Sequence, residues 1–380
     1  MRHLTLVEDP RFHCAFPSLV RLDGGRLLLA FRRGRDPRWA LPAALRKSAT
    51  AWASHWDPRS HVCVTELDQK TLLPRSDLSI LPMDPEVADQ DPSMLRTRDG
   101  TIVLASFSWY PFTSAAAHAV LPPSVTEVPD SPGASGIIHI MSYISWGAFV
   151  VTSPDEGRSW SKRSYLPLIP GSSDEPRVRA IHGGAQRGSL CEHDGKIKLL
   201  TYCRGGRERF VAHLYEAETP RGPFHHASVM EPPFDPPLDV LEPSLYVTRD
   251  GLLRALFRTS GADDRIVSAY MDATAEWTWT LHDAKGHPST PLVLSDGRTL
   301  ITYGYRHAPF GIRARLLNEP SQNLDDVPEH ILRDDLPTTD IGYPWSVELD
   351  DSEILVAYYV TTKDGTRRIE GTITDVVAFS

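Results

Sequence analysis

Cysteine is scarce in this sequence. Only four cysteines occur in 380 residues, and no two of them form a CxxC pair. Scattered thiols of this kind do not build a disulfide framework or a paired-cysteine zinc site. The histidines at positions 61, 225 and 226 also lack metal-ligand spacing. We therefore expect no metal and no cofactor.

Long apolar runs and an excess of basic residues are also missing. No apolar stretch approaches the roughly 20 residues that span a bilayer, so we expect no membrane partner. Forty Lys and Arg residues face 49 Asp and Glu residues, which gives a net charge of −9 without a local basic block. That sign is wrong for binding a phosphate backbone, so nucleic acid is not expected as a partner. Residues 1–12 do not resemble a secretory signal, which predicts a cytoplasmic protein, and nothing in the sequence indicates an oligomeric state.

Proline, by contrast, is abundant, with 32 residues in the chain. Proline removes an amide donor and clashes with the preceding helical turn, so this composition favours strands and loops. The chain also repeats itself. An alternating apolar stretch, an acidic turn that is usually Asp-Gly, and a second apolar stretch recur at residues 16–34, 91–109, 183–205, 242–261, 290–306 and 343–360. Asp-Gly is typical of tight hairpin turns, so each copy predicts an antiparallel hairpin.

The spacing of the turns leaves room after each hairpin for one more pair of strands. Six four-stranded antiparallel units predict an all-β, six-bladed β-propeller, with residues 1–380 as a single domain. The last copy is followed by only one further strand, at residues 367–376. We therefore expect residues 3–9 to supply the missing fourth strand, so that strands from the two chain ends close the ring.

One short motif sharpens the fold class. Residues 153–160, Ser-Pro-Asp-Glu-Gly-Arg-Ser-Trp, fit the pattern S/T-x-D-x-G-x-x-W. In this pattern Asp and Ser bond the amides of their own turn, Gly takes a left-handed conformation and Trp packs between sheets. This pattern is the Asp box of sialidase-like propellers, and its role is structural.

The candidate chemistry lies where the inner strands begin, because in a propeller these ends face the mouth of the central channel. Four of the six copies have an acid, a base or a phenol at their first residue or directly before it. They are Asp91, His182, Glu242 and Tyr343. Four such groups from four blades would meet on one axis, which makes them candidate catalytic residues.

Nearly the whole chain resembles the sialidase superfamily of propellers with BNR or Asp-box repeats. In that family a Glu opens the fourth inner strand and an Arg closes its partner strand, which match Glu242 and Arg258. The family's Tyr nucleophile matches Tyr343, and another family Arg matches Arg306, with Arg313 as a rival. The resemblance implies a Tyr343–Glu242 nucleophile and base pair, beside arginines that clamp a carboxylate.

The residue types suit this chemistry. A phenol has an ordinary pKa near ~10, so it needs a neighbouring carboxylate to accept its proton and cations to stabilise the phenolate. A neutral nucleophile also avoids repulsion from a carboxylate on the sugar. Guanidinium groups bind carboxylates through two parallel hydrogen bonds. Glycosidases with a Tyr nucleophile are a known exception to the two-carboxylate rule.

Two family features have no clean match. Sialidases carry Arg-Ile-Pro in the first blade, where this chain has Ala15-Phe16-Pro17. The nearby arginines at positions 32, 33 and 35 are possible substitutes, and we take Arg33 as the substrate-binding candidate. The family's acid/base Asp is also unmatched, with three candidates in the right region at Asp36, His55 and Asp57.

From this sequence we expect an exo-acting glycoside hydrolase that cleaves a terminal acidic sugar from a glycan. Tyr343, Glu242, His182 and Asp91 are its candidate catalytic residues, and the arginines are candidates for holding a carboxylate-bearing carbohydrate. Two alternatives remain open. One is a propeller polysaccharide lyase acting on uronic acids, and the other is a non-catalytic carbohydrate-binding propeller.

Overall fold

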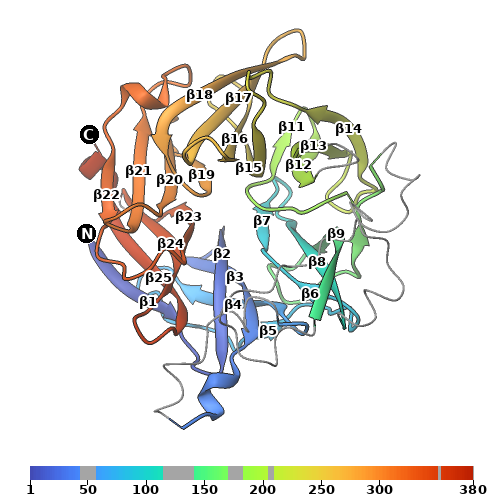
Figure 1. The fold of residues 1–380 in the computed structure, drawn as a ribbon, viewed down its shortest axis with the longest axis vertical. Coiled ribbons are helices and arrows are strands. Elements are labelled where there is room, and N and C mark those ends of the chain that lie inside the picture. Colours follow the sequence, from blue (N-terminus) through green and yellow to red (C-terminus); the bar gives the residue numbers. More distant parts are fainter. Residues whose placement is uncertain (43–56, 114–140, 170–182, 204–208, 350–351, 380) are drawn as a thin grey trace.

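The computed structural model describes residues 1–42, 57–113, 141–169, 183–203, 209–349 and 352–379. In these ranges the chain forms six antiparallel sheets and three short 3-10 turns, η1 (Pro37–Ala40), η2 (Leu324–Asp326) and η3 (Val376–Phe379). Figure 1 shows the sheets arranged radially around a common axis, with one strand of each nearest the centre. The expected all-β, six-bladed propeller is therefore confirmed.

We number the sheets as blades I to VI, each written from the inner strand outward. Blade I contains β2 (Phe12–Leu22), β3 (Arg26–Arg35), β4 (His61–Asp68) and β5 (Ser79–Ile80). Blade II contains β6 (Ala88–Asp89) with β7 (Ser93–Arg96), then β8 (Ile102–Thr113), β9 (Met141–Ser153) and β10 (Ser164–Tyr165). Blade III contains β11 (Cys191–His193), β12 (Lys196–Cys203), β13 (Val211–Ala217) and β14 (His225–Met230).

The remaining blades follow the same order. Blade IV contains β15 (Asp239–Val247), β16 (Leu253–Ser260), β17 (Arg265–Met271) and β18 (Trp277–Lys285). Blade V contains β19 (Ser289–Val293), β20 (Thr299–Tyr305), β21 (Gly311–Leu317) and β22 (His330–Arg333). Blade VI contains β23 (Ile341–Glu348), β24 (Glu353–Thr361), β25 (Arg367–Asp375) and β1 (Arg2–Val7).

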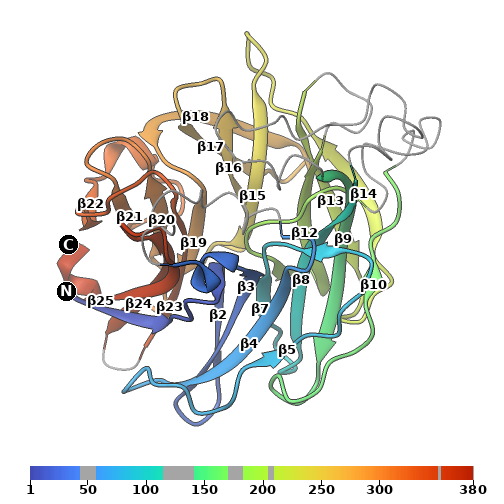
Figure 2. The ribbon, with the colours of Figure 1, turned by 60° about the horizontal axis from the view of Figure 1, so that its bottom comes forward.

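Strands from the two chain ends close the ring, as the sequence predicts. β1 pairs antiparallel with β25, with Leu4 opposite Gly371 and Arg2 opposite Ile373. Both termini consequently lie at the outer edge of blade VI (Figures 1 and 2). This pairing gives blade VI its fourth strand.

The hairpin turns differ in detail from the expected two-residue form. Among the Asp-Gly pairs of the turns that the structure describes, only Asp194-Gly195 has positive φ at both residues, 53° and 74°. In the turns at Asp99, Asp250 and Asp296 only the following glycine has positive φ. There the carboxylate accepts a hydrogen bond from the amide two residues on, at 2.9 to 3.2 Å. Aspartate thus stabilises these turns through its side chain rather than through its own backbone conformation.

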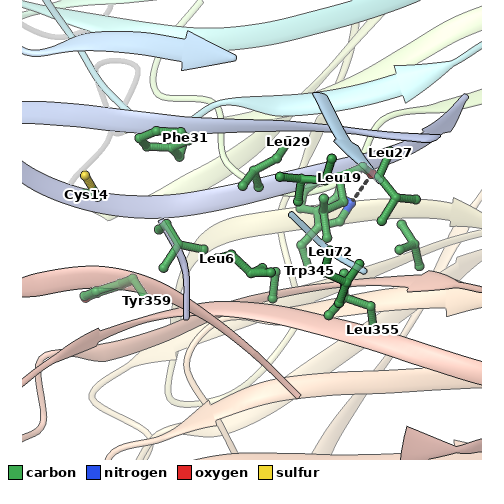
Figure 3. Close-up of a cluster of buried hydrophobic side chains, with 14 of the residues drawn as sticks. Leu6, Cys14, Leu19, Leu27, Leu29, Phe31, Leu72, Trp345, Leu355 and Tyr359 are labelled. Carbon is green, nitrogen blue, oxygen red and sulfur yellow. Dashed lines mark hydrogen bonds between the residues drawn. The ribbon is translucent and has the colours of Figure 1, made fainter. Parts of the chain in front are cut away.

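Most of the core lies between neighbouring blades. Figure 3 shows the cluster between blades I and VI, where Leu6 of β1 packs with residues of β2, β3 and β24. Trp345 is buried in this cluster, and its indole Nε1 donates to the carbonyl of Leu19 at 2.9 Å. This bond ties the inner strand of blade VI to that of blade I.

The turn at residues 153–160 is held by its own side chains. Ser153 Oγ accepts from the Gly157 amide at 2.8 Å, and Asp155 Oδ1 accepts from the Ser159 amide at 2.8 Å. Gly157 has φ of 89°, and Trp160 packs against the cluster that blades I and II share. The turn fastens these two blades together and lies apart from the inner-strand starts.

A local irregularity recurs at the start of three inner strands. Phe16, Glu242 and Tyr343 each precede a proline and have φ of 58°, 48° and 52°. The register of the strand shifts at each of them. Positive φ is uncommon for bulky residues, and a bulge of this kind redirects a side chain out of the regular alternation. The irregularity therefore positions one side chain per strand near the axis.

Candidate functional site

Two of these redirected side chains meet across the ring. The Tyr343 hydroxyl of β23 donates a hydrogen bond to Glu242 Oε1 of β15. Blade V separates the two strands in the ring, so the contact is possible only where the inner strands converge on the axis (Figure 1). Both side chains are buried, with 7% of Tyr343 and 6% of Glu242 exposed. The structure thus brings together the predicted phenol and carboxylate.

Arg258 holds the second oxygen of the same carboxylate. Arg258 lies on β16 and pairs with Leu241, the residue that precedes Glu242 on β15. Its Nη1 donates to Glu242 Oε2 at 3.1 Å. Its Nε is buried without a hydrogen-bond partner in the described part of the chain. One guanidinium therefore orients the Glu242 carboxylate and retains a donor for a further acceptor.

The protonation states follow from burial and from these charges. Burial alone would raise the pKa of Glu242, but Arg258, the Tyr343 hydroxyl and Arg306 outweigh it and lower the pKa below its ordinary value. Burial and the Glu242 charge hold the pKa of Tyr343 well above its ordinary value. The resting pair is consequently a neutral phenol hydrogen-bonded to a carboxylate.

Arg306 follows β20 and lies beside the phenol. Its Cζ is 5.6 Å from the centroid of the Tyr343 ring. Its Nε and Nη2 donate to the Ile341 carbonyl at 3.2 and 3.0 Å. Arg306 is therefore anchored on the backbone of blade VI while its charge acts on the Tyr343–Glu242 pair.

Asp91, the predicted acid of blade II, belongs to the same group. It lies in the break between β6 and β7 and is 6% exposed. Burial raises its pKa to about 7, the Glu242 charge adds to this, and Arg187 and Arg32 oppose it. A carboxyl group with this pKa can donate or accept a proton near neutral pH.

Two residues of blade III, Arg187 and Tyr202, complete the cluster and were not predicted from the sequence. Arg187 Nε lies 3.7 Å from Asp91 Oδ2. Burial and the charges of Glu242 and Asp91 raise the pKa of Tyr202 well above its ordinary value. Ala185, two residues before Arg187, pairs with Tyr202 in an isolated bridge, so the contact that positions both residues is seen only in the fold.

A pair of histidines lies beside the arginines on the blade V side. His287 Nε2 is 2.6 Å from Asp264 Oδ1, and His307 Nε2 is 3.1 Å from Asp264 Oδ2. Burial, Arg258 and Arg306 lower the pKa of His287 to about 4, although Asp264 opposes them. His287 is therefore a neutral side chain at physiological pH.

Other predicted residues are placed elsewhere. Arg33 points away from this cluster, because its Nε donates to His61 Nε2 at 3.0 Å and its Cζ lies 4.0 Å from the Phe12 ring centroid. Its neighbour Arg32 faces the opposite side of β3 and acts on Asp91 instead. The structure places Arg32 rather than Arg33 beside Asp91, because successive strand residues alternate between the two faces.

Arg313 is likewise not in the cluster. It lies on the third strand of blade V, where Nη2 donates to the Pro309 carbonyl at 3.1 Å and Nη1 to the carbonyl of Arg333. Those bonds stabilise a loop, so we remove Arg313 from the candidates. Asp57 is occupied by Arg35, with Oδ1 to Nη2 at 2.6 Å, and Asp36 by Arg38, with Oδ2 to Nη2 at 2.5 Å. Two further candidates, His182 and His55, lie outside the described residues.

The described residues contain no group of three or more His, Cys, Asp and Glu side chains that could hold a metal ion. Nor does any helix in the described ranges have the length and apolar character that crossing a bilayer requires.

Comparison with known proteins places the fold. A protein of unknown function from Dyadobacter fermentans is 28% identical, with a TM-score of 0.83 over 99% of this chain and 98% of that one. The NanB sialidase of Streptococcus pneumoniae, in its K499G mutant form, is 11% identical, with a TM-score of 0.64 over 99% of this chain and 71% of that one. The ring shares its fold with the propeller of sialidases.

A further sialidase shows the same likeness. The Hadza microbial sialidase Hz136 is 13% identical, with a TM-score of 0.60 over 97% of this chain and 66% of that one. No protein-family model and no curated protein matches the sequence. At such identities the sialidases share the architecture alone, and the activity must be argued from the cluster of side chains.

Proposed function

We propose that this protein is an exo-acting glycoside hydrolase of sialidase-like type that cleaves a terminal acidic sugar from a glycan. The observation that carries the proposal is the hydrogen bond from the Tyr343 hydroxyl to Glu242, whose other oxygen is held by Arg258. A nucleophile, its base and a cation that orients the base are thus in contact before substrate arrives. The shared fold with sialidases supports the assignment to carbohydrate.

The proposed first step forms a covalent sugar–tyrosine bond. Tyr343 Oη attacks the anomeric carbon, its proton passes to Glu242 Oε1, and the glycosidic C–O bond breaks. Because the pKa of Tyr343 is raised and that of Glu242 lowered, the proton moves only as the new bond forms. Asp91, with a pKa of about 7, is the proposed donor of the proton that the leaving oxygen takes up.

In the proposed second step, water replaces Tyr343 at the anomeric carbon. Asp91 accepts a proton from that water, and Glu242 returns its proton to the departing tyrosine oxygen. Two displacements at the same carbon retain the anomeric configuration. Arg258 and Arg306 keep positive charge beside the phenolate as it leaves.

The preference for an acidic sugar follows from the charges around the pair. Arg187, Arg258 and Arg306 surround a site whose carboxylates are Glu242 and Asp91. Since burying a charge without a counter-ion is unfavourable, an anionic substrate complements this cluster better than a neutral one.

The substitution Tyr343→Phe tests the proposal. It removes only the nucleophilic oxygen, so we expect kcat on a cleaved nitrophenyl glycoside to fall about 10³-fold or more. The panel should contain nitrophenyl sialosides and uronides together with neutral glycosides. Release of nitrophenol measures turnover, and proton NMR of the first product measures the anomeric configuration.

Three results would contradict this function. The first is a Tyr343→Phe variant that turns over substrate as fast as the wild type. The second is a first product with inverted anomeric configuration, and the third is cleavage of neutral glycosides in preference to acidic ones. A uronic-acid glycan whose product absorbs in the near ultraviolet would indicate elimination by a lyase instead. Sugar binding without turnover of any substrate would indicate a binding propeller.

A further inference from the structure

Arg187 is an almost completely buried charged side chain near the axis. It lies in the inner segment of blade III, and 1% of it is exposed. Its backbone is fixed on both sides, because Ala185 pairs with Tyr202 and the Gly188 amide donates to Ser93 Oγ of blade II at 3.2 Å. The position of the side chain is therefore set by the contacts between blades II, III and IV.

The guanidinium of Arg187 nevertheless lacks hydrogen bonds within the described part of the chain. Its Nε, Nη1 and Nη2 are all buried, and none has a hydrogen-bond partner in the described part of the chain. Asp91 Oδ2, 3.7 Å from Nε, supplies a countercharge at longer than hydrogen-bond distance. Burying five N–H donors without acceptors is unfavourable unless another molecule supplies the acceptors.

The same guanidinium is directed at the proposed nucleophile. Its Cζ lies 4.9 Å from the centroid of the Tyr343 ring and 5.7 Å from that of Trp345. Two other arginines near Tyr343 already make hydrogen bonds, Arg258 with Glu242 and Arg306 with the Ile341 carbonyl. Arg187 is thus the arginine of this group whose whole donor set is available.

We propose that Arg187 is the principal binding residue for the carboxylate of an acidic sugar, so that blade III supplies the anion-binding arginine that blade I lacks at Ala15. This inference rests on the proposed function, because it names the group that binds that site's substrate. The planar guanidinium accepts a carboxylate through two parallel hydrogen bonds, beside the ring of Tyr343. The nearby Nε of Arg258 then offers a second donor to the same anion.

Binding of free monosaccharides tests the inference. The probes are sodium glucuronate and N-acetylneuraminate, with glucose as the neutral counterpart of glucuronate, and isothermal titration calorimetry measures their Kd. We expect at least one acid to bind the wild-type protein while glucose does not. Arg187→Met should weaken that binding about 10- to 100-fold, and Arg187→Lys should weaken it less because the charge remains.

Arg96→Met is the matched control. Arg96 lies at the far end of β7 from Asp91 and pairs with Asp23 at 2.7 Å, so its loss should leave the Kd unchanged. If Arg187→Met does not fold, the inference is tested with Arg187→Lys and with a crystal of the wild-type protein soaked with the acid that binds. The acid's carboxylate should then lie within hydrogen-bond distance of Arg187.

Several outcomes would overturn the inference. They are the absence of acid binding, equal binding by wild type and Arg187→Met, and a soaked carboxylate that contacts other residues. Free monosaccharides have no glycosidic bond to cleave, so these results are independent of turnover. Acid binding lost in Arg187→Met without any hydrolase activity would uphold the subsite and refute the hydrolase. Hydrolysis with an unchanged KM in Arg187→Met would uphold the hydrolase and refute the subsite.

Discussion

At the residue scale, the site contains two carboxyl groups whose pKa values are shifted in opposite directions. Glu242 touches Arg258 and stays ionised, whereas burial keeps the Asp91 carboxyl protonated up to about pH 7. The charged groups that act on Asp91 come from three other blades, Arg187 from III, Glu242 from IV and Arg32 from I. Pairs of carboxyls with separated pKa values are what acid and base roles in one site require.

The titration of Asp91 predicts how stability depends on pH. The folded-state pKa of about 7 exceeds the ordinary value of 3.8, so protonation favours the folded state. Its contribution to the free energy of unfolding is complete below pH 3.8 and is lost as pH rises through about 7. Asp91→Asn keeps the shape without this charge. We expect the free energy of unfolding of the variant, relative to that of the wild type, to increase by at least about 1 kcal/mol as the pH rises from 4 to 8.

Urea unfolding at pH 4, 6 and 8 measures this difference. The same titration limits the proposed acid, so kcat/KM of the wild type should decline above about pH 7. A free-energy difference between variant and wild type that is equal at all three pH values would show that Asp91 titrates normally.

At the element scale, the inner strands depend on close backbone contact between blades. Gly188 has φ of 112°, and a Cβ there would lie 2.2 Å from the Pro243 carbonyl oxygen and 2.5 Å from Ser244 Oγ. Pro243 follows Glu242 directly, so Gly188 lets the segment of Arg187 approach the strand of the proposed base. One glycine thus couples two parts of the site.

Gly188→Ala should therefore damage both stability and the site. We expect a loss of about 2–4 kcal/mol in the free energy of unfolding, since a strained φ adds to overlap with backbone that cannot move aside. Gly195→Ala in the same blade is the control. Gly195 has φ of 74° but nothing within 4 Å of its Cβ position, so strain alone should cost about 1 kcal/mol. Urea unfolding would contradict this account if the two variants were equally stable.

The same elements show what the sequence could predict. Turn chemistry is local, so the acidic turns located the hairpins, and the X-Pro starts located Asp91, Glu242 and Tyr343. Blade III has no X-Pro start, and its segment is shaped by the contact of Gly188 with another blade. Because that contact is tertiary, the local sequence pattern did not indicate Arg187. The local pattern also did not settle which face of β3 turns to the axis, so it could not separate Arg32 from Arg33.

At the scale of the whole molecule, a protein with net charge −9 collects arginines around its axis. No single segment of sequence shows this, because the cluster draws residues from blades II to VI. The ring must be closed for these residues to meet, and closure depends on β1. The sheet of blade VI runs from β1 through β25 and β24 to β23, which carries Tyr343.

Leu6→Ala tests this dependence on closure. Leu6 is 5% exposed and belongs to the cluster that contains Tyr343 and Trp345, so removing its side chain leaves a cavity beside the strand that closes the ring. We expect a loss of about 2–4 kcal/mol in the free energy of unfolding. Val377→Ala, at a residue that is 68% exposed near the same chain ends, should change it by less than about 0.5 kcal/mol. Scanning calorimetry measures both, and a Leu6→Ala variant as stable as Val377→Ala would show that β1 does not contribute to holding the ring.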